Sequence, residues 1–369
     1  MKKNYTYNRT NLLTRIMLSL AAVLLLTSGT LSPLPAEAKP GIKASSSKVK
    51  VGSRTFTVQT VSIPKGTPVT LGLAKRQVGQ VEGFTSIVKN YHAEAAINGA
   101  FFNAYGGPTD PYGTFIIQGR LAHFGGYGTT LGFLKDGTAM MAPLRNSLTG
   151  TVTSDKGSSI GWYAVFLNRT PASGASTIIK YTPDRGSRVG FSGGIAVTIV
   201  DGVVTKKDTN ANSLIPKNGY VLVFTGNEKK SSDRFVVGYK VQENLVYKDD
   251  KGNAIPWQNV VTAVGAGPRL VRDGRVELNA KAEGFNDPKI LSSSAARSGV
   301  AIMPDGSILL ATVSGATMQQ WAGIMKALGA KQAMNLDGGA SSALYANGKV
   351  LTQAGRPLSN VLVFGSNVK

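Results

Sequence analysis

The residues best suited to catalysis or ligand binding lie in one short stretch near the carboxyl-terminal end of the chain, AMNLDGGASS at 333–342. Here Asp337 leaves an apolar, strand-like segment, meets the pair Gly338-Gly339 and is followed by Ser341 and Ser342. Glycines permit positive φ and let a ligand approach the backbone, whose N–H groups can then face an anion. A carboxylate, backbone amides and two hydroxyls together indicate a site for an anionic substrate.

The same stretch has a purely structural interpretation. Asp337-Gly338 is a dipeptide typical of a tight hairpin turn, in which the serines would only satisfy neighbouring backbone groups. The residues alone leave both interpretations open.

Two further stretches place polar side chains within apolar sequence. Asn98 follows the predicted short strand 95–97 and precedes a phenylalanine pair that we expect to be buried. Arg297 precedes the predicted strand 300–303, and a guanidinium suits bidentate binding of phosphate or carboxylate. An ordinary loop and a surface arginine are the simpler alternatives.

The composition excludes several classes of site. The chain has no cysteine, which rules out disulfides, thiol nucleophiles and zinc–thiolate centres. Its two histidines, His92 and His123, are too few for a zinc site without cysteine, and we expect both to be structural. No G-x-S-x-G motif supports a Ser-His-Asp triad.

The charge favours an anionic partner. The chain holds 41 Lys and Arg against 20 Asp and Glu, and removal of residues 1–38 would leave 37 against 19. Such an excess favours wall polymers that contain phosphate, anionic lipid surfaces or nucleic acid. We do not expect nucleic acid, because the basic residues are scattered and no helix-turn-helix, RNP or finger pattern is present.

The amino-terminal residues indicate export. Residues 1–38 combine a basic start, a short apolar core at 16–26 and a final Ala-Glu-Ala, which is typical of a cleaved signal peptide. We expect no membrane span after cleavage and a secreted or wall-associated protein. Residues 39–48 (KPGIKASSSK) are predicted to be a flexible lead-in.

The remainder predicts sheets. From residue 49 onwards short alternating runs are separated by turn residues, and Asp-Gly pairs begin at Asp136, Asp201, Asp273 and Asp305. We therefore expect an α+β fold of mainly antiparallel sheets with a few helices, in a single large domain over 49–369. The stretch 145–260 leaves room for a subdomain.

Two helices are expected, one near 80–91 and one after Ser314-Gly315. The second places Trp321 and Met325 on one apolar face, which we assign to the core and not to a cofactor. Ser314 or Thr317 can cap its start. A buried strand is predicted directly after it, over 332–336.

Taken together, these stretches resemble the phosphodiester glycosidase domain family, which also includes the lysosomal enzyme that uncovers mannose 6-phosphate. The resemblance rests on INGAFF at 97–102, SAARSGVAIMPDGSILLATV at 294–313, the helix-strand-NLDGG-SS run at 314–344 and RPLSNVLVF at 356–364. It extends from about residue 50 to 366. It implies hydrolysis of a sugar-1-phosphodiester between the anomeric carbon and its oxygen.

The resemblance also suggests roles for particular residues. Asp337 would be the base, the nucleophile or the stabiliser of an oxocarbenium ion, because glycoside cleavage depends on carboxylates. Asn98 and Asn360 would bind sugar hydroxyls or orient Asp337. The phosphate would be held by Arg297, Gly338, Gly339, Ser341 and Ser342. A divalent cation, Ca²⁺ or Mg²⁺, is compatible with an acid and carbonyl oxygens at Asp337, although no loop has EF-hand spacing.

Three functions follow for comparison with the structure. The leading one is a secreted hydrolase that acts on sugar phosphodiesters, in cell-wall or capsular polymers. The alternative is a non-catalytic polysaccharide-binding protein of the wall that keeps the same pocket. A nucleic-acid binder is the third, and would require steeply salt-dependent affinity for DNA.

Overall fold

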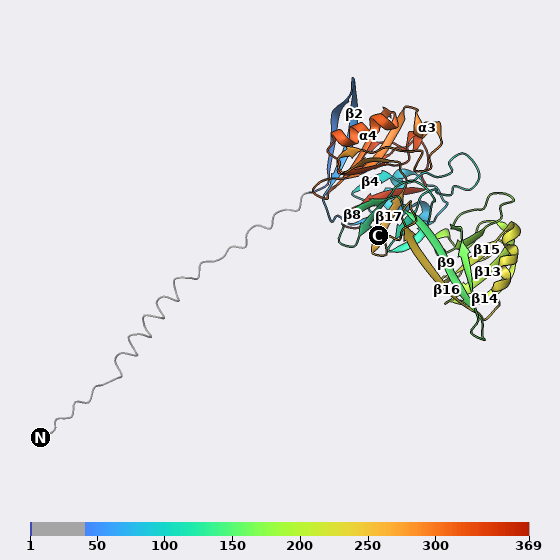
Figure 1. Cartoon of the computed structure of the whole chain (residues 1–369). Helices are drawn as coiled ribbons and strands as arrows, with labels where there is room; N and C mark the ends of the chain where they lie inside the picture. The colour runs from blue at the N-terminus through green and yellow to red at the C-terminus, as the bar shows by residue number, and fades with distance from the viewer. Residues whose placement is uncertain (2–40, 369) are drawn as a thin grey trace. The chain divides into compact units, whose positions relative to one another are not determined.

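This computed structural model describes Met1 and residues 41–368, which contain four β-sheets (Figure 1). Apart from the short parallel pair of β11 (Phe166–Leu167) and β12 (Ile178–Tyr181), neighbouring strands are antiparallel. Few helices accompany them, so the predicted α+β class is confirmed. Gly41–Lys369 form one compact unit. The signal peptide predicted for 1–38 lies, Met1 apart, outside the described residues.

A seven-stranded sheet carries the two strands that lead into the predicted site. Its order is β1 (Lys43–Val51), β2 (Arg54–Ile63), β21 (Ile308–Ala316), β20 (Ala295–Ile302), β22 (Gln332–Asn335), β18 (Arg269–Arg272) and β19 (Arg275–Val276). The helix α4 (Met318–Ala327) packs on this sheet, where it contacts β1, β18 and β21 (Figure 1). The helix and the strand that follows it therefore set the direction in which the chain enters the site.

The boundaries of α4 follow from local chemistry. Thr317 accepts a hydrogen bond from the Gln320 backbone, and the Gln320 side chain returns one to Thr317, which forms a capping box. Gly329, at φ +85°, follows the end of the helix in the left-handed conformation that favours glycine. Trp321 and Met325 are fully buried, which confirms their assignment to the core.

Two five-stranded sheets pack against the first. One has the order β24 (Lys349–Thr352), β23 (Leu344–Ala346), β4 (Ala95–Asn98), β25 (Asn360–Phe364), β3 (Val69–Leu73), and α2 (Phe84–Asn90) contacts its β25 and β3. The other has the order β6 (Arg120–His123), β5 (Phe115–Ile117), β17 (Val260–Gly265), β7 (Thr130–Leu134), β8 (Ala139–Ala142). One buried cluster joins all three sheets through residues such as Met334, Ile97 and Phe115.

An eight-stranded sheet is formed within the stretch 145–260. Its order is β10 (Ser159–Ala164), β9 (Arg145–Thr153), β16 (Lys240–Lys248), β14 (Val203–Ala211), β13 (Ser192–Val200), β15 (Gly219–Phe224), β12 and β11. One face packs in a large core that includes Val197 and Ile199, and part of the other face packs under Val189 and Ile215. The sheet therefore has a partly covered second face.

The four predicted Asp-Gly turns all join neighbouring antiparallel strands. Asp201-Gly202 has φ angles of 48° and 73°, and Asp273-Gly274 has 48° and 74°. Two consecutive positive φ angles are the signature of the type I′ turn, whose twist matches that of the strands it connects. The turn prediction is confirmed.

The flexible lead-in predicted for 39–48 is wrong from Lys43 onwards. These residues belong to β1, which pairs with β2 along its whole length from Lys43↔Ser62 to Val51↔Arg54. The Ser-rich sequence suggested disorder because it has few apolar side chains. At the edge of a sheet, however, polar side chains can face water while the backbone pairs on one side.

Every helix in the part of the chain that the structure describes is too short or too polar to cross a lipid bilayer.

Candidate active site

A pocket of about 580 Å³ lies at the end of β22, next to Asp337. Aromatic residues line part of it, among them Phe101, Tyr105, Tyr112, Tyr127 and Phe285. Three cationic residues, Lys289, Arg297 and Arg356, also line it. The turn from Asp337 to Ser341 completes the lining. We call this cavity the Asp337 pocket.

The position of Asp337 is set by two sheets. Its backbone N–H donates to the Gly99 carbonyl at 2.9 Å, and its own carbonyl accepts from Asn98 Nδ2 at 2.6 Å. One carboxylate oxygen, Oδ1, accepts from the Gly338 N–H at 2.8 Å. Since Asn98 ends β4 and Asp337 follows β22, the packing of the two sheets orients the carboxylate.

The carboxyl group of Asp337 is perturbed by its surroundings. Burial raises its pKa to about 6, against the weaker lowering by hydrogen bonds from Ser341 and the Gly338 N–H and by the charge of Arg356. A carboxyl with a pKa near 6 is largely ionised at neutral pH and can still exchange a proton readily. Asp337 can therefore act as a base, as a nucleophile or as a charge that stabilises a cation.

The glycine pair does not form the hairpin turn that was the alternative interpretation. Gly338 is extended, with φ −131°, and Gly339, with φ +60°, begins a short 3₁₀ helix over Gly339–Ser341. A Cβ atom on Gly338 would lie 2.7 Å from the Ala296 carbonyl oxygen, closer than real Cβ contacts allow. Glycine is thus required because the turn packs directly against the strand that carries Arg297.

Arg297 is buried beside the pocket, which contradicts the simpler interpretation of a surface arginine. Its Nε donates to the Ala316 carbonyl at 2.9 Å, and Nη2 donates to the carbonyls of Lys289 and Ser293 at 2.9 and 2.6 Å. No carboxylate within residues 41–368 forms an ion pair with it. Burial lowers the pKa of Arg297, but a guanidinium stays charged at neutral pH. A buried cation without a counter-ion favours an anionic ligand.

Asn98 and Asn360 are not part of the pocket lining, although we expected both to contact the sugar or to orient Asp337. Asn98 holds Asp337 through Nδ2 and accepts from the Ala343 N–H at 3.0 Å through Oδ1. Asn360 accepts from the Ala100 N–H at 2.7 Å, and its Nδ2 donates to Ser359 Oγ at 2.7 Å. Both side chains are buried and bonded at both ends, so neither has a free group for a sugar. The bond from Asn98 to the Asp337 carbonyl fits the second of its two expected roles, that of orienting Asp337.

The two serines differ in position. Ser341 lines the pocket, where its hydroxyl lowers the pKa of Asp337. Ser342 is buried outside the lining, and its Oγ has no hydrogen-bond partner within residues 41–368. Of the two serines predicted to hold the phosphate, the structure brings only Ser341 to the pocket.

Several lining residues were missed in the sequence, among them Arg356, Lys289 and Tyr105. Arg356 Nη2 donates to Tyr105 Oη at 2.9 Å, and the guanidinium carbon lies 4.8 Å from the centre of the tyrosine ring. The Lys289 ammonium lies 5.2 Å from the same ring. The hydrogen bond and charge of Arg356 lower the pKa of Tyr105, and Lys289 adds to this. Arg356 begins the RPLSN motif at 356–360, and this motif was the one feature of the sequence that pointed to any of the three.

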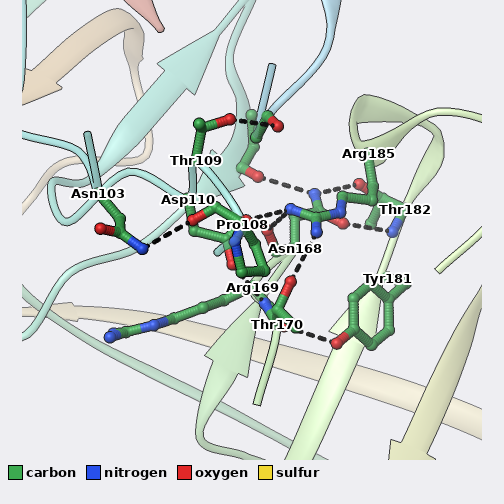
Figure 2. Close-up of polar contacts among 12 residues, drawn as sticks. Asn103, Pro108, Thr109, Asp110, Asn168, Arg169, Thr170, Tyr181, Thr182 and Arg185 are labelled. Carbon is green, nitrogen blue, oxygen red and sulfur yellow. Dashed lines mark hydrogen bonds and ion pairs between the residues drawn. The ribbon is translucent and has the colours of Figure 1, made fainter. Parts of the chain in front are cut away.

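A buried ion pair holds the loop that brings the aromatic residues to the pocket (Figure 2). Asp110 pairs with Arg185, both side chains being largely buried, and also accepts from the Thr170 N–H at 2.7 Å. The Asn103 N–H donates to the Asp110 carbonyl at 3.0 Å. The loop 103–112, which carries Tyr105 and Tyr112, is thereby fixed to the segment that follows β12.

The residues near Asp337 do not match a protein-built Ca²⁺ site. Such sites need six to eight oxygen ligands, with several carboxylates among them. Among residues 41–368 there is no group of three or more His, Asp or Glu side chains arranged for a metal, and the Asn98 amide is already bonded. We therefore derive no step through a metal.

Comparisons with known proteins bear on the family and the fold of this chain. Residues 193–365 match the sequence model of the phosphodiester glycosidase family, so the resemblance is confirmed over that part. No curated protein matches the chain significantly.

Three solved structures are similar in fold. A hypothetical protein from Synechocystis is 26% identical with a TM-score of 0.73, over 88% of this chain and 62% of that one, so the chain spans less than two thirds of its length. A predicted exported protein from Burkholderia pseudomallei is 22% identical with a TM-score of 0.67, over 84% and 74%. The zebrafish N-acetylglucosamine-1-phosphodiester alpha-N-acetylglucosaminidase catalytic domain, auto-inhibited by its pro-peptide, is 13% identical with a TM-score of 0.49, over 90% and 85%.

Proposed function

We propose that this chain, whose residues 193–365 match the phosphodiester glycosidase family, is a secreted hydrolase of sugar-1-phosphodiesters. The observation that supports this most is the meeting of Asp337 with Arg297 at one pocket. A carboxylate with a raised pKa and a buried cation without a counter-ion suit a substrate that has both a glycosidic carbon and a phosphate.

The pocket offers a different surface to each half of such a substrate. Aromatic rings such as Tyr127 and Phe285 present apolar faces to a sugar, whose C–H groups pack well on them. Arg297, Lys289 and Arg356 present positive charge to the phosphate. The anomeric carbon would lie between the two, next to Asp337.

Hydrolysis forms a bond between the anomeric carbon and a water oxygen and breaks the bond from that carbon to the phosphate oxygen. The phosphate departs as an anion, so neutralisation by Arg297 and its neighbours matters more than protonation by an acid. One preorganised donor of this kind contributes about 3–4 kcal/mol to a transition state. The ionised Asp337 stabilises the positive charge that develops on the sugar and takes up the proton of the attacking water, or attacks the carbon itself.

A second carboxylate lines the pocket but has another task. Asp287 caps the helix α3 (Pro288–Leu291) by accepting from the Lys289 N–H at 2.8 Å. We therefore assign the chemistry to Asp337.

The test is replacement Asp337→Asn, with release of reducing sugar from a panel of sugar-1-phosphate methyl diesters as the measurement. We expect a loss of roughly a thousandfold in kcat/KM, within the range for a group that transfers protons or charge. Asp305→Asn, in an exposed turn, is the matched control and should behave as the wild type. Parallel reactions with EDTA should proceed at the same rate.

A different result would favour the non-catalytic alternative. A wild-type protein that releases no sugar from any diester, yet binds wall polysaccharide equally well with and without Asp337, would be a binding protein of the wall. Equal rates for Asp337→Asn and wild type would remove Asp337 from the reaction.

We also propose that the protein is secreted and acts on a polymer of the cell wall or capsule. The signal peptide predicted at 1–38 and the similarity in fold to an exported bacterial protein support secretion. The excess of basic residues supports an anionic wall or capsular polymer as the physiological partner, in preference to nucleic acid.

A further inference from the structure

A second cavity, of about 970 Å³, lies on the eight-stranded sheet and shares no lining residue with the Asp337 pocket. Its floor is the face of β13 and β14, and its walls are the segments 183–188 and 211–217. We call it the sheet groove. It lies in the stretch where the sequence left room for a subdomain, and the proposed reaction does not use it.

Strand register explains why this face is open. Ala196 pairs with Asp208 and Thr198 pairs with Lys206, and all four side chains line the groove. The alternate residues, such as Val197, point into the core on the other side of the sheet. The loop at 211–217 covers only the neighbouring part of the face, where Ile215 is buried.

The groove has an excess of positive charge. Arg188, Lys206 and Lys217 line it together with a single acid, Asp208. Lys206 pairs with Asp208 at 2.7 Å, which leaves Arg188 and Lys217 without an ion-pair partner among residues 41–368. Arg188 is oriented by a hydrogen bond from Nη1 to the Asn212 carbonyl at 2.8 Å. Between the charges the lining includes the hydroxyls of Thr198 and Thr209 and the apolar side chains of Leu214, Ile215 and two prolines.

The wall of the groove is joined to the wall of the Asp337 pocket through the ion pair of Figure 2. Arg185 lies between Pro183 and Gly186, which line the groove. Its partner Asp110 belongs to the loop 103–112, which lines the Asp337 pocket. The Asp110–Arg185 ion pair therefore joins the segment that lines the groove to the loop that lines the Asp337 pocket.

We propose that the sheet groove binds a distal segment of an anionic polymer of phosphodiester-linked sugar or polyol units, while another segment occupies the Asp337 pocket. Arg188 and Lys217 can pair with phosphates of the polymer, while the Thr198 hydroxyl and the apolar side chains of the lining can contact the units between them. The substrate class rests on the proposed function, but binding in the groove does not require turnover.

The experiment measures binding and turnover separately, on the mature chain. Binding of a fluorescent poly(glycerol phosphate) of about ten repeats is followed by anisotropy, and turnover is followed with a sugar-1-phosphate methyl diester. Lys206→Ala with Lys217→Ala should weaken polymer binding by roughly three- to tenfold, as expected for two exposed charge contacts. Hydrolysis of the small diester should stay unchanged.

Two further variants distinguish binding in the sheet groove from non-specific attraction by the surface charge. Lys48→Ala with Lys50→Ala removes the same charge from exposed positions on β1 and should leave polymer binding as in the wild type. Asp208→Asn removes the only acid of the groove and should strengthen binding, a gain that misfolding cannot produce.

The outcomes distinguish the two proposals. Equal weakening by both lysine pairs, absence of wild-type binding, or no gain with Asp208→Asn would each contradict polymer binding in the sheet groove. If the variants bind the polymer as expected but neither they nor the wild type hydrolyse the diester, the sheet groove is a binding site and the proposed hydrolase activity is rejected.

Discussion

At Asp337 the protein keeps a carboxylate in a partly closed pocket, where its neighbours only partly offset the loss of water. Burial raises the pKa of this group to about 6 from an ordinary value near 4. The carboxylate is thus destabilised in the folded protein at neutral pH, a cost that enzymes accept at functional sites. Ser341 and the Gly338 N–H limit this cost without removing it.

This shift predicts how activity depends on pH. In the proposed reaction the ionised form of Asp337 does the chemistry, so kcat/KM for a small diester should rise with pH through an apparent pKa near 6 and level off above 7. The measurement is a pH–rate profile between pH 4 and 8. A profile that is flat across pH 5–7 would mean that another group controls the reaction.

The same shift predicts an effect on stability that does not depend on activity. Because the folded pKa lies above the unfolded one, the folded protein binds the extra proton, and stability falls as pH rises from about 4 to 6. Asp337→Asn avoids this loss, so the variant should be about 1–3 kcal/mol more stable than wild type at pH 8 and similar at pH 4. Urea unfolding at both pH values measures it; a variant less stable at pH 8 would contradict the assigned burial.

At the scale of elements, the loop 103–112 illustrates how a site wall is held without regular structure. It has no helix or long strand of its own, and the buried pair Asp110–Arg185 ties it to the segment after β12 (Figure 2). The Thr109 hydroxyl adds a bond to the Gly79 carbonyl at 2.8 Å. Tyr105 and Tyr112 reach the pocket because the ends of this loop are fixed.

Asp110→Asn should therefore weaken both the fold and substrate binding. It leaves the Arg185 charge buried without its partner, a defect that destabilises proteins by about 3–5 kcal/mol. At temperatures where the variant remains folded, KM for the diester should rise several-fold while kcat changes little, since Asp337 is held by other elements. Urea unfolding and steady-state kinetics provide the two measurements.

A double variant controls for this prediction. Asp110→Leu with Arg185→Met removes both charges and should be more stable than Asp110→Asn, as for other buried pairs replaced by apolar side chains. If KM stays at the wild-type value in both variants, the ion pair does not position the pocket.

For the whole molecule, 41 basic residues stand against 20 acidic ones, and the proposed substrate is a polyanion. Surface charges attract a polyanion over about 10 Å at moderate ionic strength, and salt screens this attraction. Raising NaCl from 20 to 500 mM should lower kcat/KM for a glycosyl-phosphate polymer by roughly tenfold. A small diester with a single charge should lose much less, and equal losses for both substrates would contradict steering.

Much of the local structure was determined by the sequence itself. The Asp-Gly turns, the cap at Thr317 and the buried face with Trp321 all depend on sterics and hydrogen bonds within a few residues. The alternation of apolar residues likewise predicted antiparallel sheets, and the residue types at Asp337 and Gly338 predicted a candidate site, at which the structure has a pocket. The polar edge strand β1 was missed because its stability comes from pairing with β2 and not from its own side chains.

Only the tertiary structure decided which residues share the site. Tyr105 and Arg356 meet in the pocket although 251 positions separate them, while Asn98 and Asn360 turn away from it to hold backbone. These outcomes depend on the order of strands, which places β4 between β23 and β25 and β20 between β21 and β22. Strand order arises from the packing of a core shared by distant segments, and no short stretch of sequence contains that information.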